Sequence, residues 1–166
     1  MHLNTIELEI LKLIENNGRV DKNDLAKMVD VSLEDLEITL KKLEDMKVIV
    51  RYMTMIDWAK IDEYQGVTAM IDVKVAPKRG VGFDEVAKRI YGFKEVQSVY
   101  LMSGVYDISV TIHGKSMNEI ASFVSQKLST LDSVLSTTTH FILKKYKHDG
   151  IVFDQGEEDK RIVVSP

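Results

Sequence analysis

The stretch VDKNDLAKMVDVSLEDLEITLKKL, residues 20–43, decides how the amino-terminal part of the chain folds. It repeats one helix-start pattern, in which an apolar residue, a capping side chain, an acid and a leucine follow at matching offsets: Val20-Asp21-x-x-Asp24-Leu25 and Val31-Ser32-x-x-Asp35-Leu36. The cap oxygen satisfies an unpaired amide, and the acid lies near the positive end of the helix. Only Asp30 and Val31 lie between the first of these helices and the cap of the next. This tight connection predicts a helix-turn-helix.

The segments on either side of this stretch have patterns of their own. Leu3-Asn4-x-x-Glu7-Leu8 repeats the helix start upstream, and the helix that it begins should end near Gly18. The residues that we expect to be buried in the first and third helices are Ile6, Ile10, Leu13 and Ile14, and Leu36, Leu40, Leu43 and Met46. From Val48 to Met53 the sequence becomes β-rich, which predicts a wing and a β linker that reaches about Gly66.

The rest of the chain predicts an α+β module. Residues 67–75 alternate between apolar and polar as in a half-buried strand, and a loop at 77–82 and a helical stripe from Phe83 to Ile90 follow. Two strands at 96–102 and 106–113 are joined by a turn at 103–105, and Ser116 caps a second helix before a last strand from about Val134 to Lys147. The order β-α-β-β-α-β is the split βαβ, or ferredoxin-like, arrangement.

This arrangement leaves one sheet face uncovered within a single chain, because both helices lie on the other face. We expect the uncovered face to carry Met70, Thr111, Thr137, Thr139 and Phe141. Such a face predicts a symmetric dimer. The expected domains are a helix-turn-helix domain at 1–50, a β linker at 51–65, a βαββαβ domain at 66–149 and an acidic carboxy-terminal tail at 150–166.

Composition excludes several classes of protein. The 166 residues are 45% hydrophobic and 29% charged, with a net charge of -4 and no cysteine, so disulfides, thiolate metal sites and cysteine nucleophiles are ruled out. The four histidines show no metal-ligand spacing, and no nucleotide-binding or hydrolase motif is present, so we expect no cofactor and no metal. No signal peptide or apolar run of membrane-spanning length is seen, which predicts a cytoplasmic protein without a membrane partner.

Several motifs in this order resemble the Lrp/AsnC (feast/famine) family of transcription regulators over about residues 3–150. The first helix Ile6-Glu7-Leu8-Glu9-Ile10-Leu11, the Gly18-Arg19-Val20 step, and Leu43-Glu44 with Val48-Ile49 are similar to the family's amino-terminal half. Gly104-x-Tyr106-Asp107 resembles its Gly-x-(Tyr/Phe)-Asp turn, and Val134-x-x-Thr137-x-Thr139 with Leu143 resembles its final strand. The resemblance implies a winged helix-turn-helix followed by a ferredoxin-like module of the RAM type.

The resemblance also implies partners. It implies sequence-specific binding of double-stranded DNA, a homodimer through the carboxy-terminal sheets that assembles further into octamer-like particles, and no enzymatic activity. A small effector, usually an amino acid, would bind at the interface between dimers. The residues we assign to the effector are Ser103, Gly104, Tyr106, Asp107, Thr137 and Thr139. The residues we assign to DNA are Lys22, Lys27, Ser32, Thr39, Lys41, Lys42 and Arg51.

The third helix departs from the family pattern in its charge. It opens Ser32-Leu33-Glu34-Asp35-Leu36-Glu37 and offers only Lys41 and Lys42 as cations, and residues 1–50 carry 7 Lys and Arg against 11 Asp and Glu, a net -4. Acids near phosphates cost affinity and bases supply it. The family's usual glycines in the turn and before the wing are Asp30 and Lys47 here.

Three functions are therefore compared. The first is an effector-controlled transcription regulator. The second is an effector-sensing assembly protein whose degenerate helix-turn-helix binds DNA only weakly. The third is an enzyme similar to the siroheme decarboxylases, which would need a basic, histidine-containing pocket that the sequence does not show.

Overall fold

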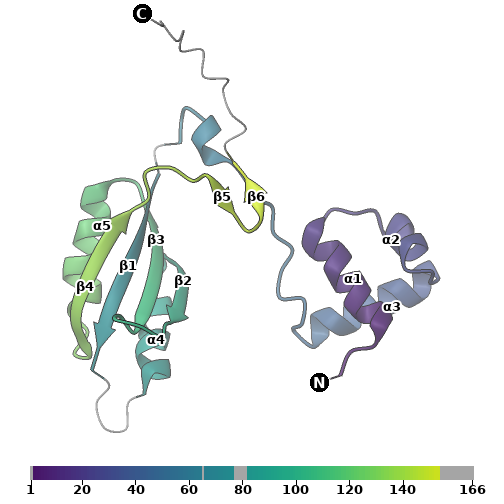
Figure 1. The fold of residues 1–166 in the computed structure, drawn as a ribbon, viewed down its shortest axis with the longest axis horizontal. Helices are drawn as coiled ribbons and strands as arrows, with labels where there is room; N and C mark the ends of the chain where they lie inside the picture. The colour runs from purple at the N-terminus through teal and green to yellow at the C-terminus, as the bar shows by residue number, and fades with distance from the viewer. Residues whose placement is uncertain (1, 65, 77–81, 154–166) are drawn as a thin grey trace, which may run out of the picture. The chain divides into compact units, whose positions relative to one another are not determined.

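The computed structural model describes residues 2–64, 66–76 and 82–153, and the chain divides into two compact units, residues 1–56 and 57–166. Each unit has its own hydrophobic core. The elements of both are labelled in Figure 1.

The first unit is the predicted helix-turn-helix. Its helices are α1 (Thr5–Asn16), α2 (Lys22–Met28) and α3 (Leu33–Asp45). Asn4, Asp21 and Ser32 cap them, each side chain accepting from a backbone amide in the first turn, as the repeated helix-start pattern predicts. The buried apolar side chains that hold the three helices together are Ile10, Leu25, Ala26, Val29, Leu36 and Leu40.

Two expected core residues of this unit are not buried. Ile6 is 41% exposed and Met46 is 37% exposed. The buried place one turn before Ile10 belongs instead to Glu7, whose carboxylate accepts from the Asn4 amide and from Lys42 Nζ. Met46 lies at the end of α3 as its C-cap, beyond the buried stripe. The prediction for Ile6 was wrong because apolar periodicity gives no weight to a buried, hydrogen-bonded acid, and the prediction for Met46 was wrong because the helix ends there.

The segment after α3 does not form the predicted β structure. The described residues between α3 and Val67 contain no strand, and a short 3-10 helix, η1 (Trp58–Lys60), lies in the expected β linker. A β-rich sequence needs a neighbouring strand for its backbone hydrogen bonds. Within the described part of this chain, residues 48–56 have no such neighbour.

Two residues at the ends of the helices adopt a backbone conformation typical of glycine. Asp30 has φ of 54° and Lys47 has φ of 56°. These are the two positions where the resemblance implies glycine, so the turn after α2 and the turn after α3 keep the left-handed geometry without it. A non-glycine residue pays roughly 1 kcal/mol or more for this conformation.

Lys47→Gly is therefore expected to raise the free energy of unfolding of the first unit by up to about 1 kcal/mol, because it removes this strain. Urea denaturation followed by circular dichroism measures the change. Lys41→Gly is the matched control, because it also replaces a lysine but does so inside α3. It should lower the free energy of unfolding by about 1 kcal/mol. Equal destabilisation by both variants would contradict the prediction.

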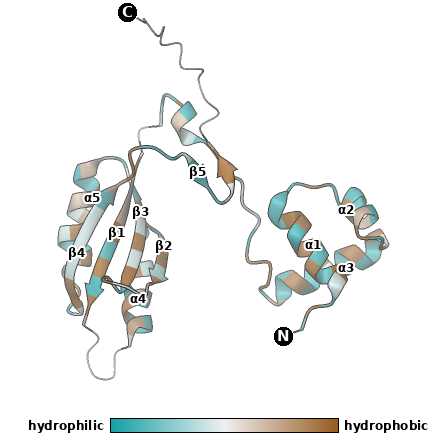
Figure 2. Ribbon diagram, viewed as in Figure 1, coloured by the Kyte–Doolittle hydropathy of each residue, from teal (hydrophilic) through white to brown (hydrophobic). Residues whose placement is uncertain are grey.

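The second unit is the predicted ferredoxin-like module. Its sheet has strands β1 (Val67–Val75), β2 (Val96–Leu101), β3 (Ile108–Gly114) and β4 (Val134–Phe141) in the order β2-β3-β1-β4, and all neighbours are antiparallel. Helices α4 (Phe83–Tyr91) and α5 (Met117–Phe123), the latter continued by the π-helical turn η2 (Val124–Leu128), cover one face (Figure 1). Alternating polar and apolar residues along β1 can be followed in Figure 2.

The register of β4 corrects the expected composition of the uncovered face. Met70 and Thr111 are partners on that face, as expected. Thr137, Thr139 and Phe141, however, lie opposite the buried Val73, Ile71 and Ala69, so they share the helix-covered side. Side chains alternate along a strand, so a register one residue away from the expected one moves each of them to the other face.

The end of the described chain also differs from the prediction. The last strand of the main sheet stops at Phe141, and residues up to Lys147 do not continue it. A small hairpin of β5 (Lys147–His148) and β6 (Ile151–Val152) follows. Most of the expected acidic tail, 154–166, and most of the expected loop at 77–82 lie outside the described residues. Among the described residues, no helix has the length and apolar character needed to cross a bilayer.

Candidate functional site

The outward face of α3 is the first candidate site, because the exposed side of the second helix of a helix-turn-helix is the one that can enter a DNA groove. Leu36, Leu40 and Leu43 are buried against the other helices. At 3.6 residues per turn, the opposite side carries Glu34, Ile38, Lys41 and Asp45. This face offers one base and two acids around the apolar Ile38.

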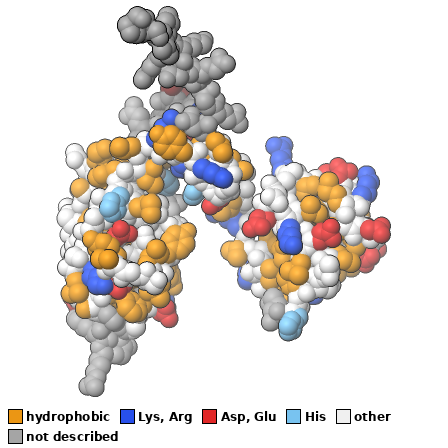
Figure 3. Space-filling view, in the orientation of Figure 1, with side chains coloured by type: hydrophobic (Ala, Val, Ile, Leu, Met, Phe, Trp, Pro, Cys, Tyr) orange, Lys and Arg blue, Asp and Glu red, His pale blue; other side chains and the backbone are white. Residues whose placement is uncertain are grey.

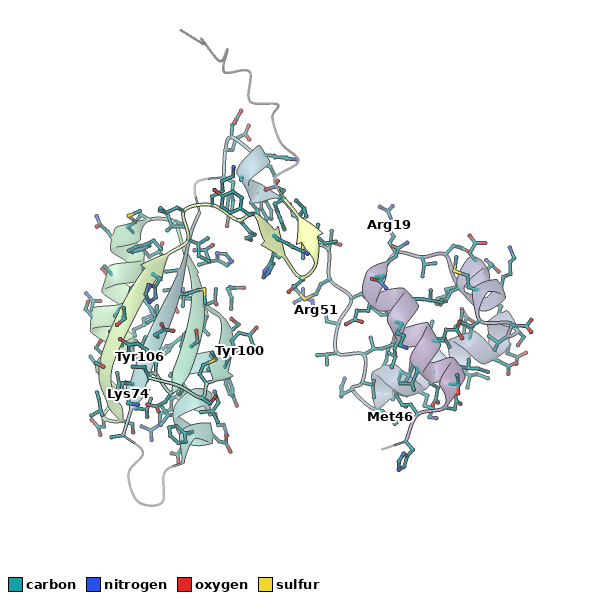
Figure 4. The ribbon with its side chains drawn as sticks, in the orientation of Figure 1. Arg19, Met46, Arg51, Lys74, Tyr100 and Tyr106 are labelled. Atoms are coloured by element: carbon teal, nitrogen blue, oxygen red, sulfur yellow. The ribbon has the colours of Figure 1, made fainter. Side chains whose placement is uncertain are left out.

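Three of the cations assigned to DNA are engaged within the first unit. Lys22 Nζ lies 2.9 Å from Glu37 Oε1, Lys27 Nζ 3.3 Å from Asp24 Oδ1, and Lys42 Nζ 2.6 Å from Glu7 Oε1. Lys41 and Arg51 form no ion pair among the residues that the structure describes. Acidic and basic side chains are interspersed on the visible face of this unit (Figure 3), and Arg51 follows α3 in the connecting segment (Figure 4).

The ion pair of Lys42 is part of the packing of α1 against α3. Glu7 is only 4% exposed, and its second oxygen accepts from the Asn4 amide at 2.9 Å. The hydrogen bond from Lys42, followed by the bond from the Asn4 backbone, lowers the pKa of Glu7, so this carboxyl is ionised at neutral pH. Lys42 therefore neutralises a buried acid, which ties its ammonium group to α1.

The two hydroxyl residues assigned to DNA have different surroundings. Ser32 Oγ accepts from the Asp35 amide at 3.0 Å and donates to Asp35 Oδ2 at 2.6 Å, so the hydroxyl is used at the helix start. Thr39 is half-buried. Of the seven assigned residues, the structure thus brings Lys41 to the outward face of α3, leaves Arg51 exposed beyond it, and gives the other five local contacts or partial burial.

A further polar contact of this unit, which sequence inspection also missed, joins Tyr52 to Glu44. Tyr52 donates to Glu44 Oε1 at 2.9 Å, and partial burial together with this bond raises the pKa of Tyr52 to about 12. The phenol therefore stays protonated and joins the connecting segment to the carboxy-terminal half of α3. No local sequence pattern predicts this contact, because Tyr52 lies beyond the end of α3 and is therefore not placed by the spacing of residues along the helix.

The turn between β2 and β3 is the second candidate site, and Asp107 fixes its position. Asp107 Oδ2 accepts from the Val75 amide at 2.8 Å, and Oδ1 accepts from Lys74 Nζ at 3.3 Å. The Val75 amide, and then Lys74, lower the pKa of the Asp107 carboxyl against the effect of its partial burial. The Asp107 backbone amide also donates to the Val73 carbonyl at 3.1 Å. Asp107 thus joins the turn to the end of β1.

The neighbouring residues complete this site. Tyr106 OH and Thr138 Oγ1 are 2.7 Å apart, and Tyr106 and Lys74 come from the same end of the sheet (Figure 4). The threonine that meets the turn is therefore Thr138, not Thr137 or Thr139. Side chains alternate along β4, so the register of β4 against β1 would have been needed to tell these three residues apart. In the described chain the amides of residues 103–106 have no hydrogen-bond partner.

The backbone at Gly104 explains why glycine occupies this turn. Its φ is 158°, and an added Cβ would meet no atom within 4 Å. The backbone angle, rather than crowding, therefore favours glycine here. The described part of the chain holds no group of three or more histidine and acidic side chains suited to a metal ion.

Comparison with known families matches both units. The family model described as winged helix-turn-helix DNA-binding matches residues 3–50, and the model described as Lrp/AsnC ligand binding domain matches residues 68–152. The two matches cover the regions that contain the two candidate sites.

Individual proteins give the same result. The chain is 64% identical to the HTH-type transcriptional regulator YugG of Bacillus subtilis over 166 residues, all of both chains. It is 25% identical to the proline dehydrogenase transcriptional activator of Rhizobium radiobacter, over 90% of this chain and 94% of the relative. A transcriptional regulator of Neisseria meningitidis, solved in complex with L-Met, superposes with a TM-score of 0.71 at 24% identity, covering 90% of this chain and 96% of that one.

Proposed function

Since the chain belongs to the Lrp/AsnC family of transcriptional regulators, we propose that an amino acid bound at the 103–107 turn of a homo-oligomer controls its binding to double-stranded DNA. The protein is a transcriptional regulator with a helix-turn-helix domain and a ligand-binding domain. We assign DNA binding to residues 1–50 and effector binding and dimerisation to 66–149. The regulator would act in the cytoplasm and without catalysis of its own.

The observation that carries the effector proposal is the group of unpaired amides beside the Asp107–Lys74 pair. Successive backbone N–H groups can hold a carboxylate. Asp107 accepts one hydrogen bond at each oxygen and has lone pairs left for an ammonium group. A free amino acid offers both charges at a short separation. The L-Met complex of the Neisseria protein of the same fold supports this class of ligand.

Wild-type protein is expected to bind at least one of the twenty amino acids in calorimetry, and Asp107→Asn to weaken that binding about tenfold or more, because a charge-assisted hydrogen bond is lost. Asp84→Asn, an exposed acid on α4, is the matched control and should bind as wild type does. Absence of any binding amino acid, or equal affinity of the Asp107 and Asp84 variants, would show that the site is misplaced.

The uncovered sheet face supports the dimer proposal. It carries the exposed Met70, Tyr100 and His140, and among the described residues no element of the same chain covers it. His140 Nε2 lies 3.3 Å from Asp72 Oδ2 on this face. We propose that two chains pack these faces together and that dimers assemble further into octamer-like particles. Light scattering on the full chain should give at least a dimer at micromolar concentration, and a monomer would refute this.

The acidic outward face of α3 favours one alternative. If the first unit does not bind DNA with useful affinity, the protein is an effector-sensing assembly protein with a degenerate helix-turn-helix. Amino-acid binding without a salt-dependent shift of any genomic fragment would establish that alternative.

A further inference from the structure

Ile38 is the most exposed apolar side chain of α3, and it lies at the centre of the outward face of this helix. It is 61% exposed, whereas Leu36, Leu40 and Leu43 are buried. At about 100° per residue, Ile38 is turned about 160° from both Leu36 and Leu40. The isoleucine therefore points almost directly away from the core of the first unit.

The side chains beside Ile38 on this face are charged. Glu34 lies one turn before it, and Lys41 and Asp45 lie one and two turns after it. None of these three forms an ion pair or a side-chain hydrogen bond with another residue that the structure describes. On the outward face of α3, the apolar patch is thus one side chain wide and has charged groups around it.

A patch of this size fits a single apolar group rather than the apolar surface of a protein. Protein interfaces have a buried core to which several apolar or aromatic side chains contribute. The outward face of α3 belongs instead to the segment that matches the winged helix-turn-helix DNA-binding family. In the major groove, the apolar group that a base edge presents is the C5-methyl group of thymine. Ile38 is complementary to that methyl group.

The charged neighbours of Ile38 do not select thymine. The carboxylates of Glu34 and Asp45 accept hydrogen bonds only, and the thymine edge offers an acceptor and a methyl group but no donor. The ammonium group of Lys41 donates to guanine oxygens and nitrogens as well as to thymine, so it does not single out thymine. Of these four residues, only Ile38 distinguishes a base that carries a methyl group.

We propose that Ile38 contacts the C5-methyl group of a thymine in the major groove and makes thymine the preferred base at that position of the DNA site. The inference rests on the proposed binding of double-stranded DNA by the first unit. The contact removes the isoleucine side chain and the methyl group from water. Burial of one methyl group strengthens binding about fourfold.

The test begins with full-length wild type, which selects its sites from a random-sequence duplex library with and without the pooled amino acids. The selected duplex is then the probe, and each thymine is replaced in turn by deoxyuridine, which keeps the base pair but lacks the methyl group. Wild type should lose about fourfold in affinity at one thymine of a half-site. Ile38→Ala should bind the selected duplex at least about fourfold more weakly and should lose nothing further on the same replacement, as a double-mutant cycle requires.

Two further variants control for the loss of apolar surface. Leu8→Ala removes an apolar side chain of α1 that is 46% exposed, and it should keep the wild-type sensitivity to deoxyuridine. Ile38→Val keeps both branches at Cβ, so it should retain most of that sensitivity. Circular dichroism of each variant checks that the helices are intact.

The outcomes separate this proposal from the proposed function. If wild type selects no site and binds no duplex, the proposed DNA binding fails, and the role of Ile38 fails with it. DNA binding stands and the role of Ile38 is refuted in two cases. In the first, wild type binds but loses affinity at no thymine when the methyl group is removed. In the second, Ile38→Ala loses as much affinity as wild type at the sensitive thymine.

Discussion

Leu36→Ala is expected to lower the free energy of unfolding of the helix-turn-helix unit by about 2–5 kcal/mol, the range for a fully buried leucine. Leu36 is completely buried at the centre of a core of six side chains. A unit of this size has only about 0.05–0.15 kcal/mol of stability per residue, so the loss is a large part of the total. DNA binding should fall with it.

The measurement can separate the two units. Urea denaturation followed by far-ultraviolet circular dichroism should show an early loss of helix, whereas the fluorescence of Trp58, the single tryptophan and part of the second unit, should change at the wild-type concentration. Ile38→Ala, on the same helix but 61% exposed, is the matched control and should stay within about 0.5 kcal/mol of wild type. Similar losses in the two variants would contradict the assigned core.

Replacing Glu34 and Glu37 together by glutamine is expected to strengthen non-specific DNA binding by about tenfold for each additional phosphate that the protein neutralises at roughly 0.1 M salt. Glu34 lies on the outward face of α3, and Glu37 holds Lys22 at 2.9 Å. The double replacement removes two repelling charges and frees one ammonium group. The slope of log affinity against log salt should steepen by about 0.9 for each additional phosphate neutralised.

The control for this experiment makes the same charge change elsewhere on the unit. Glu9→Gln with Glu15→Gln alters two exposed acids of α1 and should have a smaller effect. Lys41→Ala should weaken all DNA binding and flatten the salt slope. Lys42→Ala should instead lower stability, because it leaves Glu7 buried without its partner. If the glutamine pair binds no more tightly than the control and Lys41→Ala binds as wild type does, α3 does not face DNA.

Two features of the candidate sites follow from sequence patterns. The Gly104-x-Tyr106-Asp107 motif placed the turn correctly between two strands, and the apolar stripe of α3 placed Lys41 outward. Lys22, Lys27 and Lys42 are also cations near α3, but the structure pairs each with an acid. A residue's type was visible in the sequence, whereas its partner was not.

The positive-φ turns give a second example. The resemblance implied glycine at these two positions, where this chain has Asp30 and Lys47. The structure keeps φ near 55° at both, at 54° and 56°. Asp30 lies between α2 and α3, and Lys47 lies where the Val48 and Ile49 amides turn back to donate to the Leu43 carbonyl. These contacts fix the two turns, so the surrounding structure determines the backbone angle and the side chain tolerates it.

By itself, the sequence determined what local rules control. Capping side chains set the starts of α1, α2 and α3, and alternation of apolar residues set β1. Helix starts and half-buried strands depend on residues within a few positions of one another, so a short stretch carries the whole signal.

Only the tertiary structure decided which distant residues meet. Glu7 and Lys42 are 35 positions apart, and Tyr106 and Thr138 are 32 apart. Whether Thr137, Thr138 or Thr139 reaches the turn depends on the register of β4 against β1, and a shift of one residue reverses every side chain on the strand. That register is set by the packing of the whole sheet against α4 and α5, which no local pattern contains.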